Sequence, residues 1–171
     1  MKVEFKENFI PTLINNANVE LISILKSKGL TISTAESFTG GSIASKLTSV
    51  SGASSVFYEG IVAYNENAKA KRLGVTVDTI KRCHPVSYEV ALEMAKGLIE
   101  SKNCQIGIST TGIAGPNSDE SGFPVGLCYV GIAYKDNVTV YKFNLQGSRQ
   151  EIVEKGSNLA INLAINTIKN I

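Results

Sequence analysis

The sequence predicts an α/β fold: a mixed, mostly parallel sheet of about five strands forms the middle layer of a three-layer α/β/α sandwich. Short apolar runs rich in β-branched residues alternate with segments of helical periodicity, as in parallel strands joined by helices. The last two apolar runs are joined at Asp136 and Asn137, which is a hairpin signal. Ser148 and Glu151 match a capping box that begins a C-terminal helix. No repeat or linker interrupts residues 1–171, so we expect a single domain.

The first half of the chain alternates helix and strand patterns. Gly29 and Gly74 mark helix ends, because glycine readily adopts the backbone conformation that terminates a helix. In chain order, we expect a helix over much of residues 11–29, a strand at 30–34, a helix at 40–50, a loop at 51–55, a strand at 56–65 and a short helix at 66–74. Each of the two strands therefore ends at a junction with a helix.

The second half contains the third strand and the hairpin. Ser87 stands before apolar residues at helical spacing and is the expected N-cap of a helix. In chain order, we expect one or two helical turns at residues 76–83, a helix from 88 to about 101, a strand at 104–110, a loop at 111–124, strands at 125–134 and 138–145, and the C-terminal helix. The loop is rich in Gly, Pro, Asp and Ser, which is typical of irregular structure.

Composition and charge exclude several classes of partner. The formal net charge is +2 and the 17 Lys and Arg are scattered, which argues against a nucleic-acid partner. No apolar run approaches the roughly 20 residues of a membrane span, and the N-terminal residues lack the apolar core of a signal peptide. The three cysteines are odd in number and lack a CxxC pair, which argues against a zinc site or a disulfide framework. We therefore expect a cytoplasmic protein that binds neither nucleic acid nor membrane.

The stretch STAESFTGG, residues 33–41, places hydroxyls, a carboxylate and two glycines where a strand meets a helix. Gly40 and Gly41 allow backbone amides to approach a ligand closely, and amides at a helix start favour an anion. The pattern is neither a Walker loop nor GxGxxG. Three interpretations remain open: a plain helix cap, a phosphate cradle, or a turn that carries Ser37 as a nucleophile.

A serine nucleophile needs a neighbouring base. The single histidine, His84, precedes a proline in a loop that the sequence does not place beside Ser37. A desolvated lysine is the main alternative, and Lys69 follows Tyr64, at the end of the second strand, by five residues. Five residues turn two side chains about 140° apart in a continuous helix, but a strand-to-helix corner can bring them together. An exposed helix charge remains the other interpretation of Lys69.

Two loop segments belong to the same expected edge of the sheet, and Arg149 is a separate candidate. TTGIAGP, residues 110–116, follows the third strand and is either a simple turn or a second amide-rich loop. The segment after it, residues 117–126, is expected to form a flexible flap over that edge. Arg149 lies in the first turn of the last helix, where the helix dipole disfavours a cation by roughly 0.3 kcal/mol. It either serves an anionic ligand or simply tolerates the position.

Four segments together resemble one protein family. TAESFTGG, GIVAYNENAKAKRLGV, VSYEVALEMAKG and TTGIAGPNSDESGFPVG occur in the order, and at roughly the spacing, of the CinA C-terminal family, which includes stand-alone nicotinamide-nucleotide amidases. The resemblance extends from about Leu13 to the C-terminus, and the combination of AES-x-TGG with TGIAGP is specific. It implies an α/β/α sandwich, no cofactor or metal, and a homodimer or higher homo-oligomer.

The resemblance also implies an activity: hydrolysis of the carboxamide of nicotinamide mononucleotide, a pyridine nucleotide, to nicotinate mononucleotide and ammonia. Ser37 matches the nucleophile, and Tyr64 and Lys69 match the tyrosine and lysine that act as general acid and base. On this hypothesis Lys69 accepts the Ser37 proton directly or through Tyr64. Amides of residues 39–41 hold the oxyanion, and Arg149 is the charged candidate for the phosphate. The expected substrate contacts are Glu36, Thr39, Gly40, Gly41, Thr111, Gly112 and Arg149.

The sequence departs from the family pattern at several positions. Asn65 replaces a usual serine, Ser148 replaces a usual aspartate, and HPVS at residues 84–87 replaces a Gly-Ala-Val-Ser-like string. Asn65 and Ser148 keep open a second function, a catalytically inactive nucleotide-binding or interaction module of the same fold. Ammonia release distinguishes the enzyme from that module. A Rossmann-type oxidoreductase is disfavoured because the chain lacks GxGxxG.

Overall fold

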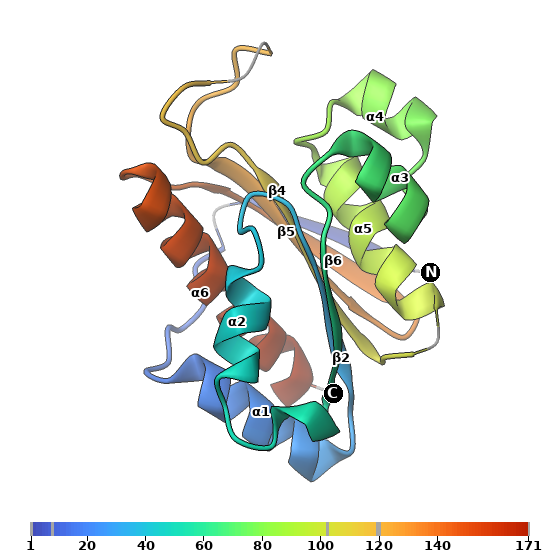
Figure 1. Ribbon diagram of the computed structural model, residues 1–171, viewed down its shortest axis with the longest axis vertical. Coiled ribbons are helices and arrows are strands. Elements are labelled where there is room, and N and C mark those ends of the chain that lie inside the picture. The colour runs from blue at the N-terminus through green and yellow to red at the C-terminus, as the bar shows by residue number, and fades with distance from the viewer. Residues whose placement is uncertain (1, 8, 102, 119–120, 171) are drawn as a thin grey trace.

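The chain alternates strands and helices, as seen in a computed structural model that describes residues 2–7, 9–101, 103–118 and 121–170 (Figure 1). The strands are β1 (Lys2–Glu7), β2 (Ile32–Glu36), β3 (Phe57–Val62), β4 (Ile106–Gly112), β5 (Leu127–Tyr134) and β6 (Asn137–Asn144). The helices are α1 (Ala17–Lys28), α2 (Ser42–Thr48), α3 (Glu66–Leu73), α4 (Val77–Cys83), α5 (Tyr88–Glu100) and α6 (Arg149–Lys169), with a short 3-10 turn, η1 (Ala53–Ser55), before β3. Every helix and strand that the sequence predicts is present, with shifts at several ends.

The strands form one mixed sheet in the order β1-β6-β5-β4-β2-β3. β2 runs parallel to both β3 and β4, and β1 runs parallel to β6. β5 is antiparallel to both of its neighbours, and it forms the predicted hairpin with β6. Helices α1, α2 and α6 pack together on one face of the sheet, and α3, α4 and α5 pack together on the other (Figure 1). The predicted three-layer α/β/α sandwich is therefore confirmed.

The strand that the sequence does not predict is β1. It lies at one edge of the sheet and pairs in parallel with β6, with Lys2 opposite Asn137. Lysines and glutamates alternate in it with Val3 and Phe5. Charged residues are common on edge strands, where they discourage pairing with other chains. The local sequence gives no sign of a partner near the other end of the chain, so the sheet has six strands in place of the five expected.

Helix α1 begins at Ala17, later than its apolar periodicity suggests. Asn16, which precedes it, has a left-handed backbone with φ 56°. The Ile14 amide donates to Asn162 Oδ1 of α6 over 2.9 Å, so the segment before α1 is attached to α6 and does not continue the helix. Leu13, which fitted the helical pattern, is 64% exposed.

The longest helix, α6, lies with one face against the sheet. The predicted capping box closes its N-terminus: Ser148 Oγ accepts from the Glu151 amide, and the Glu151 carboxylate accepts from the Ser148 amide. Ile152, Ile161 and Ile168 are buried. Across the part of the chain that the structure describes, no helix combines the length and the apolar content that crossing a bilayer requires.

The parallel strands β3, β2 and β4 place three neighbouring carboxyl ends at one edge of the sheet. The segments that follow these ends are the three junctions that the sequence singles out. Ligand sites of α/β sheets form at such edges. Buried Ile32, Ile106 and Ile108 anchor β2 and β4 in the core below α1, α2 and α6, so the junctions extend from well-packed strands.

Candidate active site

Ser37 is the first residue after β2, and hydrogen bonds on both sides of it fix its backbone. Its amide donates to the Thr110 carbonyl at 3.0 Å, and its carbonyl accepts from the Gly40 amide at 3.1 Å, which closes a turn. The side chain is 7% exposed and lines a pocket at the edge of the sheet. Thr110, the first residue of the TTGIAGP segment, therefore helps to position the candidate nucleophile.

Glu36 is buried beneath this turn and is 1% exposed. Its carboxylate accepts hydrogen bonds from the Thr34 and Thr39 hydroxyls at 3.3 and 2.7 Å, and from the amides of Gly41, Ile43 and Ala44 at 3.0, 3.0 and 2.8 Å. These amides belong to the start of α2, where no intrahelical acceptor exists. The chain therefore supplies its own anion to the N-terminus of α2.

The expected contacts of Gly40 and Gly41 with an oxyanion are corrected by these bonds. The Gly40 amide donates to the Ser37 carbonyl, and the Gly41 amide donates to Glu36. Both glycines have positive φ, 60° and 98°, so their role is to allow the turn. Glu36 and the Thr39 hydroxyl also bond within the turn, and none of these four residues is among the described residues that line the pocket. They shape the turn that carries the nucleophile.

Lys69 reaches Ser37 from the neighbouring strand-to-helix corner. Asn65 caps α3, because its Oδ1 accepts from the Asn67 amide at 2.8 Å. One turn further, Lys69 is only 3% exposed, and its Nζ donates to Ser37 Oγ at 3.0 Å. This contact is the one that a lysine base for Ser37 requires. The interpretation of Lys69 as an exposed helix charge is wrong.

The surroundings of Lys69 favour its neutral form. Burial lowers the pKa of the Lys69 ammonium below its ordinary value, because removal from water penalises the charged form. Glu66 acts in the opposite direction with a smaller effect, since its Coulombic attraction raises the same pKa. A lysine with a lowered pKa is more often neutral near pH 7 and is then able to accept a serine proton.

Glu66→Gln is expected to shift the rising limb of the pH–rate profile to lower pH. Glutamine removes the attraction that raises the pKa of Lys69, so Lys69 loses its proton at lower pH. The measurement is kcat/KM for amide hydrolysis between about pH 6 and pH 10. Glu100→Gln, at the exposed end of α5, is the matched control. A midpoint that stays in place or rises in Glu66→Gln would mean that Lys69 is not the titrating base.

Tyr64 and Arg149 meet at the rim of the pocket. Arg149 donates through Nη2 to the Tyr64 hydroxyl and through Nη1 to the Gly115 carbonyl, both at 2.6 Å. Tyr64 is 59% exposed, and among the described contacts its hydroxyl makes no hydrogen bond to Ser37 or Lys69. Arg149 therefore joins the segments after β3 and β4 to the start of α6.

Ser37, Tyr64 and Lys69 share one pocket of about 370 Å³. Its lining consists of Ser37, Phe38, Tyr64, Glu66, Lys69, His84, Pro85, Val86, Gly112 and Ala114. Gly112 lies in this wall, whereas Thr111 supports it from outside the lining: the Thr111 hydroxyl donates to the Pro85 carbonyl at 2.7 Å. The expected flap follows Ala114, and its residues 119 and 120 lie outside the described residues.

The sequence did not place residues 84–86 in this pocket. They form the connection between α4 and α5, and nothing local to them indicates that it returns to the end of β2. The departure HPVS from the family pattern was the one available signal. Phe38 and Glu66 were also missed, although each lies close in the sequence to a predicted catalytic residue.

The described residues outside this pocket show neither a metal-binding cluster nor an activated thiol. The described residues contain no group of three His, Cys, Asp or Glu side chains placed to hold a metal ion. Cys104 and Cys128 are buried free thiols, and burial raises the pKa of Cys128 to about 12. A thiol with so high a pKa is protonated and unreactive near neutral pH.

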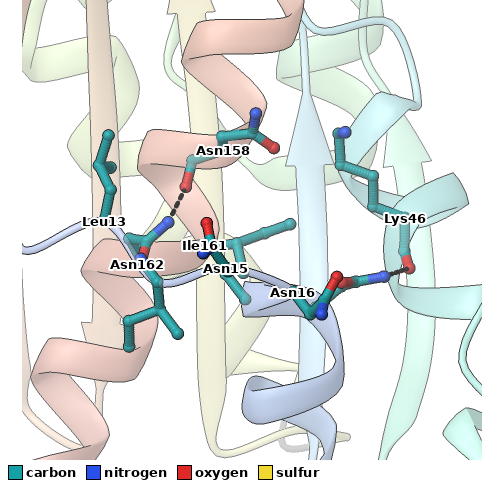
Figure 2. A pocket seen from close by; sticks show the side chains of 10 residues that line it. Leu13, Asn15, Asn16, Lys46, Asn158, Ile161 and Asn162 are labelled. Atoms are coloured by element: carbon teal, nitrogen blue, oxygen red, sulfur yellow. Dashed lines mark hydrogen bonds between the residues drawn. The ribbon is translucent and has the colours of Figure 1, made fainter.

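A second pocket, of about 350 Å³, lies between the segment before α1, α2 and α6 and shares no lining residue with the first (Figure 2). Its polar lining is Asn15, Asn16, Asn18, Lys46, Asn158 and Asn162. Asn162 Nδ2 donates to the Asn158 carbonyl at 2.8 Å, and Asn18 Nδ2 donates to the Lys46 carbonyl at 3.0 Å. These bonds join neighbouring elements, and the lining holds no activated nucleophile, so the Ser37 pocket is the candidate active site.

Comparison with known proteins agrees with the fold and the motifs. The family described as the CinA C-terminal domain matches residues 15–168. A relative from Caldicellulosiruptor saccharolyticus, whose name describes it as competence-damage inducible, is 44% identical over 159 residues, which is 92% of this chain. The chain spans only 39% of that relative's length.

Two solved structures are similar over nearly their whole length. A CinA superfamily protein from Klebsiella pneumoniae gives a TM-score of 0.89 at 23% identity, over 92% of this chain and 100% of that one, which shows the shared fold. A competence/damage inducible protein from Agrobacterium tumefaciens gives a TM-score of 0.83 at 32% identity, over 92% of this chain and 98% of that one.

Proposed function

Because the chain belongs to the CinA C-terminal domain family, we propose that it hydrolyses nicotinamide mononucleotide to nicotinate mononucleotide and ammonia. Ser37 is the nucleophile and Lys69 is the base. The observation that carries this proposal is the 3.0 Å contact between Lys69 Nζ and Ser37 Oγ, in a pocket where burial lowers the pKa of Lys69. A serine beside a neutral lysine is equipped to attack a carboxamide carbon.

The first half-reaction forms an acyl-enzyme. Neutral Lys69 accepts the proton of the Ser37 hydroxyl while Oγ bonds to the carboxamide carbon, and the carbonyl electron pair moves to oxygen. The Lys69 ammonium then gives that proton to the amide nitrogen. The C–N bond breaks and ammonia leaves, so Lys69 is neutral again and the acyl group is carried by Ser37.

The second half-reaction consumes water. Lys69 takes a proton from the water as its oxygen attacks the acyl carbon, and it returns the proton to Ser37 Oγ as the ester bond breaks. One carboxamide and one water thus give one carboxylate and one ammonium. This scheme assigns all four proton transfers to Lys69. Tyr64 is proposed to shape the rim instead, since its hydroxyl bonds to Arg149.

The amides of Phe38 and Thr39 are the proposed donors to the oxyanion. They directly follow Ser37, and among the described residues neither amide donates a hydrogen bond within the chain. Phe38 also lines the pocket beside the nucleophile. A preorganised donor of this kind contributes about 3 kcal/mol to stabilising the transition state.

Arg149 is the proposed contact of the nucleotide phosphate. A guanidinium has five N–H donors, and Arg149 directs single bonds to Tyr64 and Gly115. The phosphate is separated from the carboxamide by the ring and the ribose, so a cation at the rim suits it better than one beside Ser37.

Asn65 and Ser148 are the two departures from the family pattern on which the alternative of an inactive module depends. Both residues act as helix N-caps. Asn65 Oδ1 accepts from the Asn67 amide, and Ser148 Oγ accepts from the Glu151 amide. Ser, Asn and Asp all serve well as N-caps. Helices α3 and α6 therefore keep their starts, and these departures do not favour the inactive module over the enzyme.

Ser37→Ala is expected to lower ammonia release from nicotinamide mononucleotide by about 10³-fold or more, because no other group in the proposed mechanism forms the acyl bond. We expect Ser37→Ala to fold normally, because it removes only one small hydroxyl. Thermal unfolding tests this. Ser45→Ala, an exposed position on α2, is the matched control and should keep normal turnover. Near-normal release by Ser37→Ala would refute the nucleophile, and no release by the unmodified chain would favour the inactive module.

A further inference from the structure

His84 has a backbone conformation that favours glycine. It is the C-cap of α4, with φ 73° and ψ 148°. Residues with a Cβ rarely adopt positive φ, and such strained residues cluster at functional sites. Glycine would take this conformation without strain. What distinguishes His84 from a glycine at this corner is its imidazole.

Contacts on both sides of His84 hold the imidazole and its loop. His84 Nδ1 accepts from the Val86 amide at 3.1 Å, and the His84 carbonyl accepts from the Ser87 hydroxyl at 2.8 Å. The ring also packs edge to face against Phe123, with centroids 5.1 Å apart and an interplanar angle of 81°. The imidazole is therefore oriented before any ligand binds.

The pocket has two walls that differ in chemistry. Ser37, Glu66 and Lys69 supply its reactive and charged groups, and they come from the junctions after β2 and β3. The connection between α4 and α5 supplies three consecutive wall residues, an imidazole followed by Pro85 and Val86. This second wall contains rings and an apolar side chain, which suit the flat face of an aromatic ring.

We propose that His84 selects an aromatic carboxamide by packing its imidazole against the ring of the substrate. This inference rests on the proposed function and adds the residue that recognises the ring. A carboxamide carbon at the attack distance of about 3–3.5 Å from Ser37 Oγ holds a directly attached ring inside the pocket. Paired rings are stabilised at centroid separations of about 4.5–7 Å, whereas a flexible aliphatic amide offers no such face.

Two substitutions separate the ring of His84 from its backbone role. His84→Asn keeps a Cβ at this backbone position, as histidine does, and a side-chain oxygen able to accept from the Val86 amide. His84→Gly removes the side chain and the strain together. Thermal unfolding of both variants should stay close to that of the unmodified chain, which establishes that any functional change is not a loss of fold.

The measurement is a comparison of KM with kcat for ammonia release from nicotinamide mononucleotide. We expect both variants to raise KM by about tenfold, with kcat changed by less than about threefold. In the Ser37→Ala background, which binds without turnover, calorimetric titration with the same nucleotide should show the same tenfold loss for His84→Asn.

An unchanged KM and affinity in His84→Asn would overturn the inference while leaving the proposed function in place. A fall in kcat without a change in KM, or a loss of affinity that tracks a lower unfolding temperature, would also overturn it. If the chain with His84 intact neither binds nor hydrolyses the nucleotide, the proposed function itself fails and the inference fails with it.

Discussion

Lys69→Met is expected to abolish most turnover and, at the same time, to stabilise the fold. Methionine keeps the buried volume filled but has no amine to accept the Ser37 proton, and loss of a positioned base lowers kcat by about 10²- to 10⁴-fold. Lys69 is 3% exposed, and burial penalises its charged form. Removing that cost should raise the free energy of unfolding by about 1 kcal/mol. Ammonia release and urea unfolding measure the two effects.

The stabilisation by Lys69→Met should depend on pH in one direction. Because the folded-state pKa of Lys69 is lowered, the unfolded chain holds the proton more tightly. The unmodified chain therefore gains stability as pH rises from that folded pKa toward about 10.4, the ordinary value of lysine. Methionine does not titrate, so the advantage of the variant is largest below the folded-state pKa of Lys69 and shrinks as pH rises above it.

Lys71→Met, at an exposed position of the same helix, is the matched control and should change neither quantity appreciably. A Lys69→Met chain that is less stable than the unmodified chain at pH 7 would contradict the prediction. That result would mean that the contact between Lys69 and Ser37 contributes more than desolvation costs.

Glu36→Ala is expected to lower the free energy of unfolding by about 3–5 kcal/mol. The carboxylate is buried and accepts from the first amides of α2 and from two threonine hydroxyls, so its removal leaves these donors without their acceptor. Folded domains are stable by only about 5–15 kcal/mol, so this is a large fraction of the total. Urea unfolding, followed by circular dichroism, gives the value.

Glu154→Ala provides the comparison for Glu36→Ala. Glu154 pairs with Lys46 at 2.7 Å, but its side chain is 55% exposed. An exposed ion pair contributes less than about 1 kcal/mol, so this variant should be nearly neutral. Equal effects of the two substitutions would show that the network around Glu36 is replaced by water at little cost.

Much of the fold follows from local sequence patterns, and the exceptions are non-local. The β-branched runs predict the strands β2 to β6, including the hairpin, and the caps at Ser87 and Ser148 start the helices that they predict. β1 is missed because its stability depends on pairing with β6, which a short charged segment does not reveal. The late start of α1 likewise depends on the bond between Ile14 and Asn162.

Some features of the candidate site could likewise be predicted from the sequence, whereas others depend on non-local contacts. Ser37 and Lys69 follow adjacent parallel strands, and the family resemblance assigns both to catalysis. Together these two observations predict that the residues share one pocket, as they do. The glycine pattern did not reveal which acceptors bind the amides of Gly40 and Gly41, and those acceptors prove to be internal. His84 was missed because its place in the pocket depends on how α4 and α5 pack over the sheet.

The internal carboxylate of Glu36 also has a consequence for the direction in which a nucleotide binds. A helix start beside a nucleophile normally attracts the most negative part of a ligand. Here Glu36 already occupies that start, so a phosphate gains nothing by lying next to Ser37. Arg149 offers an exposed guanidinium at the rim. If the chain acts on a nucleotide as proposed, we expect electrostatics to orient it with its phosphate outward and its amide first, which disfavours binding in the reverse, unproductive direction.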